Sequence, residues 1–502
     1  MARVAGVDVD TRHWIGGRRV GSSEAFDDIS PIDQSVIARI SRGGVDEAEQ
    51  AVAAATAAFP AWSATAPTER ARLLHAIADG VDKRIDELAI VETTDNGALI
   101  RSHKRGVMPR VAHNFRFFAD YLTEDLGHPD FETRGHRNHV SWDPAGPAVL
   151  ISPWNAPLML ATWKVAPALA AGDTVVLKPS EWSPLTASLL ADIAAEAGLP
   201  DGVFNVVQGF GAEAGAALTQ HPDVRRISFT GSVPTARTIA AAAAANLTPV
   251  SLELGGKSPF VIFADADLDL AVTNAVEQYD NAGQVCLSGT RLLVEESIRD
   301  EFVSRFLARA GALRQGDPRE EATDIGPSIH PRQFERVDGF VQRAVAEGAG
   351  ILLGGGPNED LGGLYYRPTL FTGVRPDSEI STQEVFGPVL VLHTFADEAE
   401  AIALANDSEF GLAAMVFTGN PQRADRVSAA LVAGTVWVNC FFVRDLRAPF
   451  GGARHSGVGR EGGTWSFDFF CEVKNTVFAP SGWTAQNSAG PTGHDLQDEV
   501  DV

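Results

Sequence analysis

The sequence has few cysteines: only Cys286, Cys440 and Cys471 occur in 502 residues, and they are far apart. This spacing matches neither a disulfide framework nor the paired ligands of a zinc site. No uninterrupted apolar run approaches the ~18 residues of a membrane-spanning helix, and the first residues lack the apolar core of a signal peptide. These absences predict a cytoplasmic protein with no metal site and no membrane partner.

Positive charge is also scarce. The 41 lysines and arginines are outnumbered by 65 aspartates and glutamates, which gives a formal net charge of −24. With no basic stripe to offset this charge, a nucleic-acid partner is excluded. The net charge says little about a small substrate, because a binding cavity can carry the opposite local sign.

Hydrophobic periodicity indicates the fold class. A hairpin turn is expected at Gly16-Gly17, followed by helical patterns from residue 45 to about 117. From residue 148 to 254, short apolar strands alternate with helices, one of them over 212–219, which is typical of a doubly wound parallel sheet. A second section follows over 261–438, with strands at 291–294 and 389–392. The sequence therefore predicts an α/β fold with two sheets.

Cys286 lies in a setting that suits a reactive thiol. It follows Gly283-Gln284, a flexible and polar approach, and precedes the strand expected at 291–294. A thiol at a turn between elements is placed to react, whereas an inert cysteine usually lies inside an apolar run. A single loop cysteine is nevertheless more often a packing residue, so other parts of the chain must support the assignment.

Two polar residues follow strand ends and would suit the chemistry of a thiol. Glu253 closes an apolar strand, and a carboxylate there faces the crevice where open α/β sheets bind ligands. Partial desolvation would raise its pKa toward the range of a general base. Asn155 follows another strand, and its amide could donate to an oxyanion. The simpler alternatives are an acid that caps a turn and an asparagine that forms one.

Three turns have features of a nucleotide site. Thr230-Gly231-Ser232 joins a strand to a helix, where backbone N–H groups suit a pyrophosphate, and the turn ending at Gly211 is similar. Lys178 and Glu181 follow a third strand, where they could bond ribose hydroxyls. Each turn alone is a weak signal, since glycine and serine are common in α/β turns.

Taken together, these motifs resemble those of the aldehyde dehydrogenase superfamily, over nearly the whole chain from about Trp14 to Val477. Their order and spacing make the match specific. The matching motifs are Pro153-Trp154-Asn155, Lys178-Pro179-Ser180-Glu181, Phe229-Thr230-Gly231-Ser232, Leu252-Glu253-Leu254-Gly255-Gly256-Lys257, Gly283-Gln284-Val285-Cys286, Glu384-Val385-Phe386-Gly387-Pro388 and Pro449-Phe450-Gly451-Gly452.

The resemblance implies covalent catalysis with NAD. Cys286 would attack the aldehyde, Asn155 and the Cys286 backbone N–H would hold the oxyanion, and Glu253 would activate water against the thioester. Glu181 would bond both ribose hydroxyls and repel a 2′-phosphate, which favours NAD over NADP. The residues implied around the cofactor are Ile151, Trp154, Lys178, Glu181, Gly211, Phe229, Gly231, Ser232, Leu254, Glu384 and Phe386.

The resemblance also implies three parts of the molecule. A Rossmann-like, NAD-binding domain would comprise residues 1–120 and 141–254, and an α/β catalytic domain residues 255–464. A small β arm for homodimer or homotetramer assembly would comprise residues 121–140 and 465–480. Residues 481–502 are polar and predict a tail with little structure of its own.

Arginines at the expected substrate mouth predict a carboxylated aldehyde. Arg444 stands where many family members carry an aromatic residue, and Arg110 falls on the helix that lines the opposite side. Guanidinium groups match carboxylates in a bidentate way, although either arginine could instead form a surface ion pair. Ala156, Trp163 and Phe450 would shape the rest of the pocket.

The sequences of residues 443–447 and 460–467 are most similar to those of the semialdehyde dehydrogenases of aromatic meta-cleavage pathways. These enzymes act on 5-carboxymethyl-2-hydroxymuconate or 2-hydroxymuconate semialdehyde. One alternative is a dehydrogenase of betaine aldehyde or of simple aliphatic or aromatic aldehydes, which an aromatic mouth would favour. Another is a cysteine-dependent (thio)esterase without redox chemistry, which would need no nucleotide site. A non-catalytic protein would not need Cys286, Glu253 and Asn155 together.

Overall fold

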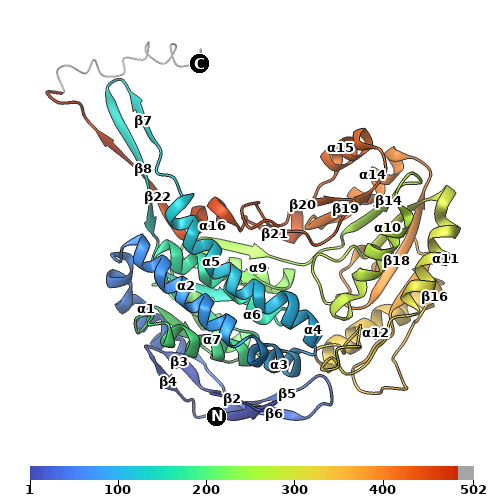
Figure 1. Cartoon of the computed structure of the whole chain (residues 1–502), viewed down its shortest axis with the longest axis horizontal. Coiled ribbons are helices and arrows are strands. Elements are labelled where there is room, and N and C mark those ends of the chain that lie inside the picture. Colours follow the sequence, from blue (N-terminus) through green and yellow to red (C-terminus); the bar gives the residue numbers. More distant parts are fainter. Residues whose placement is uncertain (484–502) are drawn as a thin grey trace.

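The computed structural model describes residues 1–483, so the predicted polar tail lies outside the described residues from residue 484 onward. Two α/β lobes lie side by side, and a narrow arm projects from the first of them (Figure 1). Within residues 1–483, no helix is both long and apolar enough to cross a membrane.

The first lobe is built on an eight-stranded sheet of order β21-β13-β12-β9-β10-β11-β3-β4. Its five central strands, β13 to β11 in this order, run parallel, as the alternation of strands and helices predicts. The strands are β3 (His13–Ile15), β4 (Arg18–Val20), β9 (Pro147–Ile151), β10 (Thr174–Lys178), β11 (Phe204–Val206), β12 (Arg226–Thr230), β13 (Val250–Glu253) and β21 (Gly457–Val458).

Helices cover both faces of this sheet. Strands such as β9 and β10 are apolar on both faces, and the helices bury them along their whole length. The helix expected over 212–219 begins with a π-helical turn, Gly211–Gly215, before α8 (Ala216–Gln220). The other helices of this lobe include α1 (Val45–Ser63), α2 (Pro67–Lys83), α3 (Ile85–Asn96), α5 (Met108–Glu124), α6 (Pro157–Ala171), α7 (Leu185–Glu196) and α9 (Val233–Ala244).

The second lobe contains a seven-stranded sheet of order β16-β17-β18-β15-β14-β19-β20, parallel except for β16. The strands predicted at 291–294 and 389–392 are β15 and β18. The strands are β14 (Pro259–Ile262), β15 (Arg291–Glu295), β16 (Gly350–Leu353), β17 (Thr369–Thr372), β18 (Val389–Phe395), β19 (Ala413–Phe417) and β20 (Thr435–Val438). The helices include α10 (Leu268–Val276), α11 (Arg299–Ala310), α12 (Pro331–Ala346), α14 (Glu398–Asn406) and α15 (Pro421–Ala430).

A late segment of the chain returns to the first sheet. Strand β21 pairs antiparallel with β13, and Leu254 N donates to Ser456 O at 3.0 Å. The two lobes are therefore interleaved in sequence. Nothing in the local sequence around residue 457 indicates this pairing, because a two-residue strand has no periodicity of its own.

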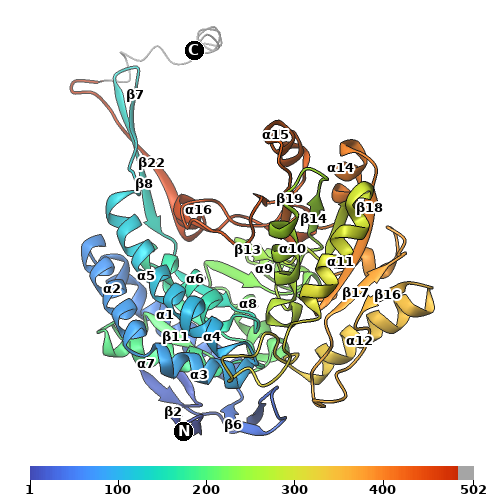
Figure 2. The same ribbon diagram turned by 45° about the vertical axis from the view of Figure 1, so that its right-hand side comes forward.

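The arm is an antiparallel sheet of β7 (Asp130–Thr133), β8 (His136–Pro144) and β22 (Cys471–Phe478), and it extends away from the body in both views (Figures 1 and 2). The strands of the arm start later in the chain than residues 121 and 465, where the two arm segments were predicted to begin. Helices occupy the segments that lead into the arm from both directions. Tyr121 on α5 stacks on Phe467 of α16 (Gly463–Phe470), with ring centroids 5.9 Å apart. This contact extends both helices into the region predicted as arm.

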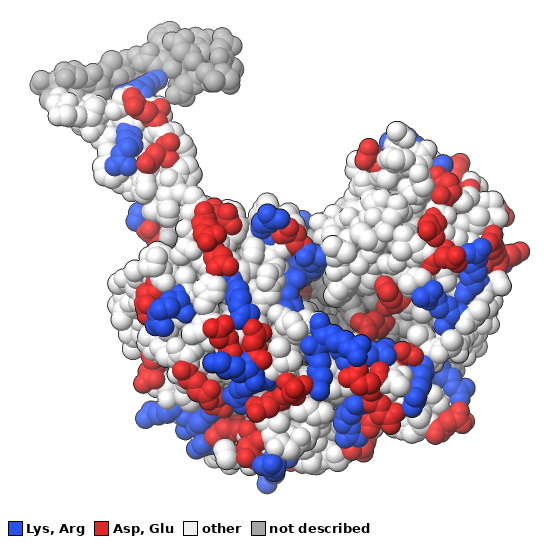
Figure 3. Space-filling model, in the orientation of Figure 1, with Lys and Arg blue, Asp and Glu red and all other residues white. Residues whose placement is uncertain are grey.

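The surface is acidic overall but mixed in detail. On the face shown in Figure 3, acidic and basic side chains alternate, and the basic ones form no continuous stripe.

Candidate active site

A cavity of about 630 Å³ brings the predicted residues together between the two lobes. It lies where the ends of β9 and β13 face the loop of Cys286. The predicted residues that line it are Arg110, Asn155, Ala156, Trp163, Glu253, Leu254, Cys286, Arg444 and Phe450. Residues from several distant segments thus share one enclosed space, as expected for a ligand pocket.

The backbone before Cys286 has an unusual shape. Asn281, Ala282 and Gly283 have φ angles of 50°, 54° and 71°, in the left-handed region. A Cβ atom on Gly283 would lie 2.1 Å from Gly387 O, so only glycine fits there. Strained residues of this kind persist only where surrounding contacts hold them, and they are common at functional sites.

Asn155 and Gln284 supply those contacts. Asn155 Nδ2 donates to Gln284 O at 2.9 Å, and Asn281 Nδ2 donates to Asn155 O at 3.0 Å. The Gln284 side chain accepts from Ile329 N at 3.0 Å and donates to Asn281 O, also at 3.0 Å. An amide group has two N–H donors, so Asn155 retains one for a ligand in the cavity.

The Cys286 thiol lies in a poorly solvated and acidic environment. Burial, together with Glu384 and Glu253, raises its pKa to about 12, and Arg444 acts in the opposite direction. The sulfur is therefore protonated at neutral pH in the absence of ligands. Its reaction requires that this proton be removed, because the thiolate is the nucleophile.

Glu253 is placed to take up a proton. It is 4% exposed, and neither carboxylate oxygen has a hydrogen-bond partner among residues 1–483. Burial and the neighbouring Glu461 raise its pKa well above the usual value, while Lys164 and Arg444 oppose this shift. The Glu253 carboxylate has room because residue 451 is glycine: a Cβ atom on residue 451 would lie 2.7 Å from Glu253 Oε1.

An ion pair that the sequence analysis missed lies behind Glu253. Lys164 Nζ donates to Glu461 Oε1 at 2.6 Å and to Ser228 Oγ at 2.9 Å, and all three side chains are buried. The partners are 297 positions apart in the chain, so no local pattern links them. One signal was available: Lys164 is the only charged residue in the apolar helix α6, and a buried lysine requires a partner.

Arg110 and Arg444 meet at the same aromatic ring. The Arg444 guanidinium lies 3.7 Å from the ring centroid of Phe450 and 4.8 Å from that of Trp163, while Arg110 is 5.7 Å from Trp163. Neither arginine forms an ion pair within residues 1–483, and Arg444 Nη2 has no hydrogen-bond partner there.

Burial and the charge of Arg110 lower the pKa of Arg444 to about 10, so Arg444 remains charged at neutral pH. Two guanidinium groups without an ion-pair partner in the described residues face one cavity, and they favour an anionic ligand although Glu253 and Glu461 also line it. The aromatic rings beneath them limit the orientations that the guanidinium planes can adopt.

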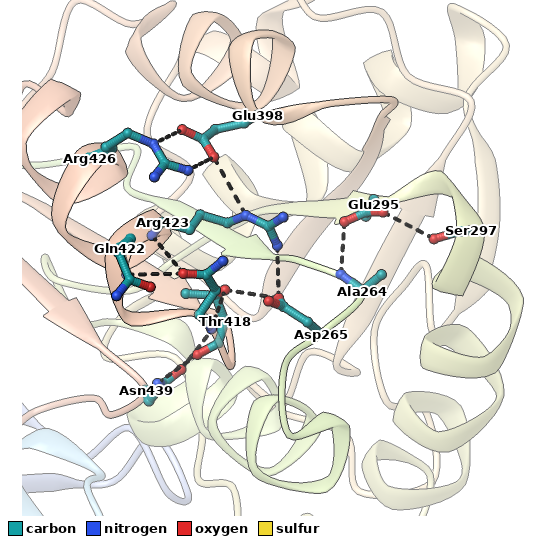
Figure 4. Close-up of polar contacts among 11 residues, drawn as sticks. Ala264, Asp265, Glu295, Ser297, Glu398, Thr418, Gln422, Arg423, Arg426 and Asn439 are labelled. Carbon is teal, nitrogen blue, oxygen red and sulfur yellow. Dashed lines mark hydrogen bonds and ion pairs between the residues drawn. The ribbon is translucent and has the colours of Figure 1, made fainter.

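A network at the strand ends of the second sheet anchors the loop of Arg444 (Figure 4). Asn439, directly after β20, donates to Thr418 O at 2.9 Å and accepts from Thr418 N at 3.0 Å. Thr418 Oγ1 in turn donates to Asp265 Oδ1, which also accepts from Arg423 Nη1 at 2.9 Å. Asn439 has a φ of 52°, which asparagine tolerates better than most residues.

The predicted cofactor residues lie along the ends of the first sheet. Lys178 Nζ contacts Glu181 Oε2 at 3.2 Å after β10, and Ser232 caps α9 after β12. Ile151, Phe229 and Leu254 are buried beside them, and Gly211 begins the π-helical turn after β11.

Glu384 and Phe386 approach this region from the second lobe. Glu384 Oε1 accepts from Gly256 N at 2.9 Å, and burial raises the pKa of its carboxyl to about 7. A Cβ atom on Gly255 would lie 2.1 Å from the Glu384 carboxylate, so glycine is needed there. Phe386 packs edge-to-face against Trp154, with centroids 5.2 Å apart.

Residues 19–476 match the Aldehyde dehydrogenase family. The chain belongs to this family. Among the curated relatives of this aldehyde dehydrogenase, 2-hydroxymuconic semialdehyde dehydrogenase of Pseudomonas sp. (strain CF600) is 45% identical, over 93% of this chain and 99% of that protein. The 5-carboxymethyl-2-hydroxymuconate semialdehyde dehydrogenase of Escherichia coli is 44% identical, over 90% and 98%. A solved indole-3-acetaldehyde dehydrogenase in complex with NAD+ is 38% identical, with a TM-score of 0.92 over 94% of this chain and 97% of that one.

Proposed function

We propose that this aldehyde dehydrogenase oxidises a semialdehyde with at least one carboxylate, of the muconate type, to the corresponding acid with NAD. The observation that carries the proposal is the pair Arg110 and Arg444, which line the cavity of Cys286 and have no ion-pair partner within residues 1–483. The names of the two curated relatives support the same substrate class.

The residues of the first sheet fit NAD, which accepts a hydride when bound. Glu181 and Lys178 offer an acceptor and a donor to ribose hydroxyls, and the Glu181 carboxylate would repel a 2′-phosphate. Glu384, held in place by Gly256 N, offers a second carboxylate from the opposite lobe. The N-terminus of α9, with the backbone N–H groups near Ser232, suits a pyrophosphate.

Oxidation begins when the Cys286 thiol gives its proton to the Glu253 carboxylate, which must release it before the second step, and the sulfur bonds to the aldehyde carbon. The free N–H of the Asn155 amide and the Cys286 backbone N–H hold the resulting oxyanion. The carbon-bound hydrogen would leave as a hydride, for which bound NAD would be the acceptor, and the sulfur remains in a thioester.

Hydrolysis of the thioester is the task of Glu253. Its carboxylate removes a proton from water as the water oxygen bonds to the acyl carbon, and the carbon–sulfur bond breaks. The products are the acid and the regenerated thiol. The raised pKa of Glu253 makes it a stronger base than an exposed glutamate.

Steady-state NAD reduction with a panel of aldehydes tests the substrate. Loss of a charge-assisted bond costs about 1.5–3 kcal/mol, so Arg444→Ala should raise KM for carboxylated aldehydes about 10- to 150-fold. KM for neutral aldehydes should change little. Arg447→Ala is the matched control, because Arg447 is exposed and paired with Asp445. Equal effects on both aldehyde classes, or faster turnover of uncharged aldehydes by the unaltered enzyme, would contradict the proposal.

The alternative functions predict different results in such experiments. A betaine aldehyde dehydrogenase must bind a cation, which Arg110 and Arg444 would repel. A (thio)esterase would hydrolyse esters without NAD, and NAD would not raise its melting temperature.

We also propose that the enzyme is a cytoplasmic homodimer or homotetramer assembled through the arm. Its three cysteines are free thiols, which suits a reducing compartment. The arm exposes large apolar side chains, which usually mark an interface. These are Phe131, Val473, Val477 and Phe478. Light scattering of the intact protein and of a variant with polar residues at these positions tests this assembly, and an unchanged mass would contradict it.

A further inference from the structure

Two aromatic rings meet across the boundary between the lobes. Trp182 follows β10 of the first lobe, and His330 is the N-cap residue of α12 in the second. Their rings stack with centroids 4.1 Å apart and an interplanar angle of 27°. Both side chains are only partly buried, so the stack reaches the surface where residues of the two lobes meet.

The stack adjoins the residues assigned to the cofactor. Trp182 follows Glu181 directly, and the charge of Glu181 acts on the His330 ring. His330 also lies edge-to-face with Trp154, at 6.0 Å, and Trp154 continues to Phe386 of the opposite lobe. Aromatic rings from both lobes therefore form a continuous row along the cleft.

His330 is suited to a lasting contact with Trp182. Its Nδ1 accepts from Gln333 N at 3.0 Å, which fixes the ring orientation and caps α12. Burial lowers the pKa of His330 to about 4, so the ring is neutral at physiological pH. A neutral ring with a fixed orientation stacks without the cost of desolvating a charge.

We propose that Trp182 and His330 form an aromatic clasp that closes the cofactor cleft between the lobes and slows the release of NAD and NADH. The inference rests on the proposed function, because it takes the residues beside the stack to bind NAD. The clasp fixes the spacing between Glu181 and Trp154 on one wall and Phe386 on the other. A cleft with fixed walls binds with a smaller entropic cost, and the cofactor leaves only when the stack opens.

The clasp is also joined to the nucleophile loop. Ile329, next to His330, donates its N–H to Gln284 Oε1, and Gln284 Nε2 donates to Pro327 O at 3.4 Å. Gln284 is two residues before Cys286. Because Gln284 holds the backbone of 327–329 independently of the rings, loss of the stack should affect the cofactor more than the thiol.

Two substitutions remove one ring each and preserve the surrounding structure. Trp182→Ala deletes the indole, and His330→Asn deletes the imidazole but keeps a side-chain acceptor for the α12 cap. A stacked pair contributes about 0.5–1.5 kcal/mol, so each variant should weaken NAD binding and speed NADH release about two- to tenfold. Trp182→Phe should restore most of the loss, and the double variant should be no worse than the stronger single one.

Calorimetric NAD binding and stopped-flow NADH release, both without aldehyde, measure these effects in the full-length protein. Trp483→Ala is the matched control, since Trp483 pairs with His136 in the arm at 5.8 Å, away from the cleft. Unchanged binding and release in folded Trp182→Ala and His330→Asn would overturn the clasp, and so would tighter binding. If the unaltered protein binds no NAD, the proposed function fails and the clasp with it.

Discussion

Glu253 and Asp265 both lie at or just beyond the end of a strand, each in a different sheet, yet their surroundings differ. Glu253, at the end of β13, is buried with no hydrogen-bond partner in the described part of the chain. Asp265, after β14 of the second sheet, accepts from both Thr418 and Arg423 (Figure 4). The strand ends thus hold a buried carboxylate without a hydrogen-bond partner among residues 1–483 in one lobe and a hydrogen-bonded network in the other.

The difference shows how one architecture can serve two purposes. A buried carboxylate without partners costs stability, but its raised pKa makes it useful as a base. A carboxylate that accepts from two neighbouring side chains serves as an anchor, because these hydrogen bonds fix its position. The second network holds Asn439 and, through it, the loop of Arg444. Substitutions at the strand ends of the first sheet should therefore change the rate of the reaction. Substitutions at the strand ends of the second sheet should change the position of the Arg444 loop and the free energy of unfolding.

The largest effect is expected for Cys286→Ala. Without the thiol no thioester forms, and aldehyde oxidation should fall by at least about 10³-fold, as for other enzymes that lose their nucleophile. NAD affinity, measured by calorimetry, should stay nearly the same. Cys440→Ala is the control, since Cys440 is a second partly buried cysteine that does not line the cavity. Residual turnover close to that of the unaltered enzyme would contradict the assignment.

Glu253→Gln should rank next, because loss of a general base typically costs about 10²–10⁴-fold. Acid release should slow more than hydride transfer, so about one NADH per site should form in a burst before slow turnover. Since the pKa of Glu253 is raised, its base form increases as pH rises above the ordinary range of glutamate.

The steady-state rate of the unaltered enzyme should therefore rise with pH in this range, and the variant should lose that dependence. A variant that shows no burst and keeps the pH profile would place the base elsewhere.

A smaller effect is expected for Asn439→Gly. Glycine keeps the left-handed backbone but removes both hydrogen bonds to Thr418, so the loop of Arg444 loses an anchor. KM for carboxylated aldehydes should rise about three- to tenfold, at about 1 kcal/mol of lost positioning, with kcat for neutral aldehydes nearly unchanged. The control is Asn420→Gly in the same network, because Asn420 caps α15 and does not contact the loop. Equal effects of both variants would show that only stability is involved.

Arg423→Ala should have the smallest effect on activity. Arg423 pairs with Asp265 and Glu398 at a partly exposed site and lies over the Phe263 ring. Its loss should lower the free energy of unfolding by about 1 kcal/mol, with little change in kcat/KM. Urea denaturation and steady-state kinetics measure the two quantities. A large loss of activity at unchanged stability would remove the contrast between the two lobes.

Much of the fold and of the candidate site could be predicted, because short patterns in the sequence indicate them. The alternation of buried strands and helices indicates parallel sheets, and parallel strands bring their carboxyl ends to one edge. Asn155 and Glu253 were therefore expected at the same edge of the sheet, although the order of β9, β12 and β13 comes only from the structure. Gly283 was expected to let the backbone bend before Cys286, and the structure adds its left-handed conformation.

Other features depend on contacts between distant segments and leave no local pattern. The pairing of Lys164 with Glu461, the addition of β21 to the first sheet and the stack of Trp182 on His330 are all of this kind. The contact of Tyr121 with Phe467, where the helices lead into the arm, is also of this kind. Burial and neighbouring charges, which set the pKa of Glu253, become known only from the folded structure.

The late return of the chain to the first sheet has a consequence for biosynthesis. During translation, Lys164 is made long before its partner Glu461, which lies 297 positions further on. Until then, the outer edge of β13 lacks β21, and an open edge is a template for association with other chains. A nascent chain thus has a nearly finished first lobe with an exposed edge and an unpaired lysine. The first sheet and the ion pair of Lys164 are complete only when residues 457–461 have been released and have folded back.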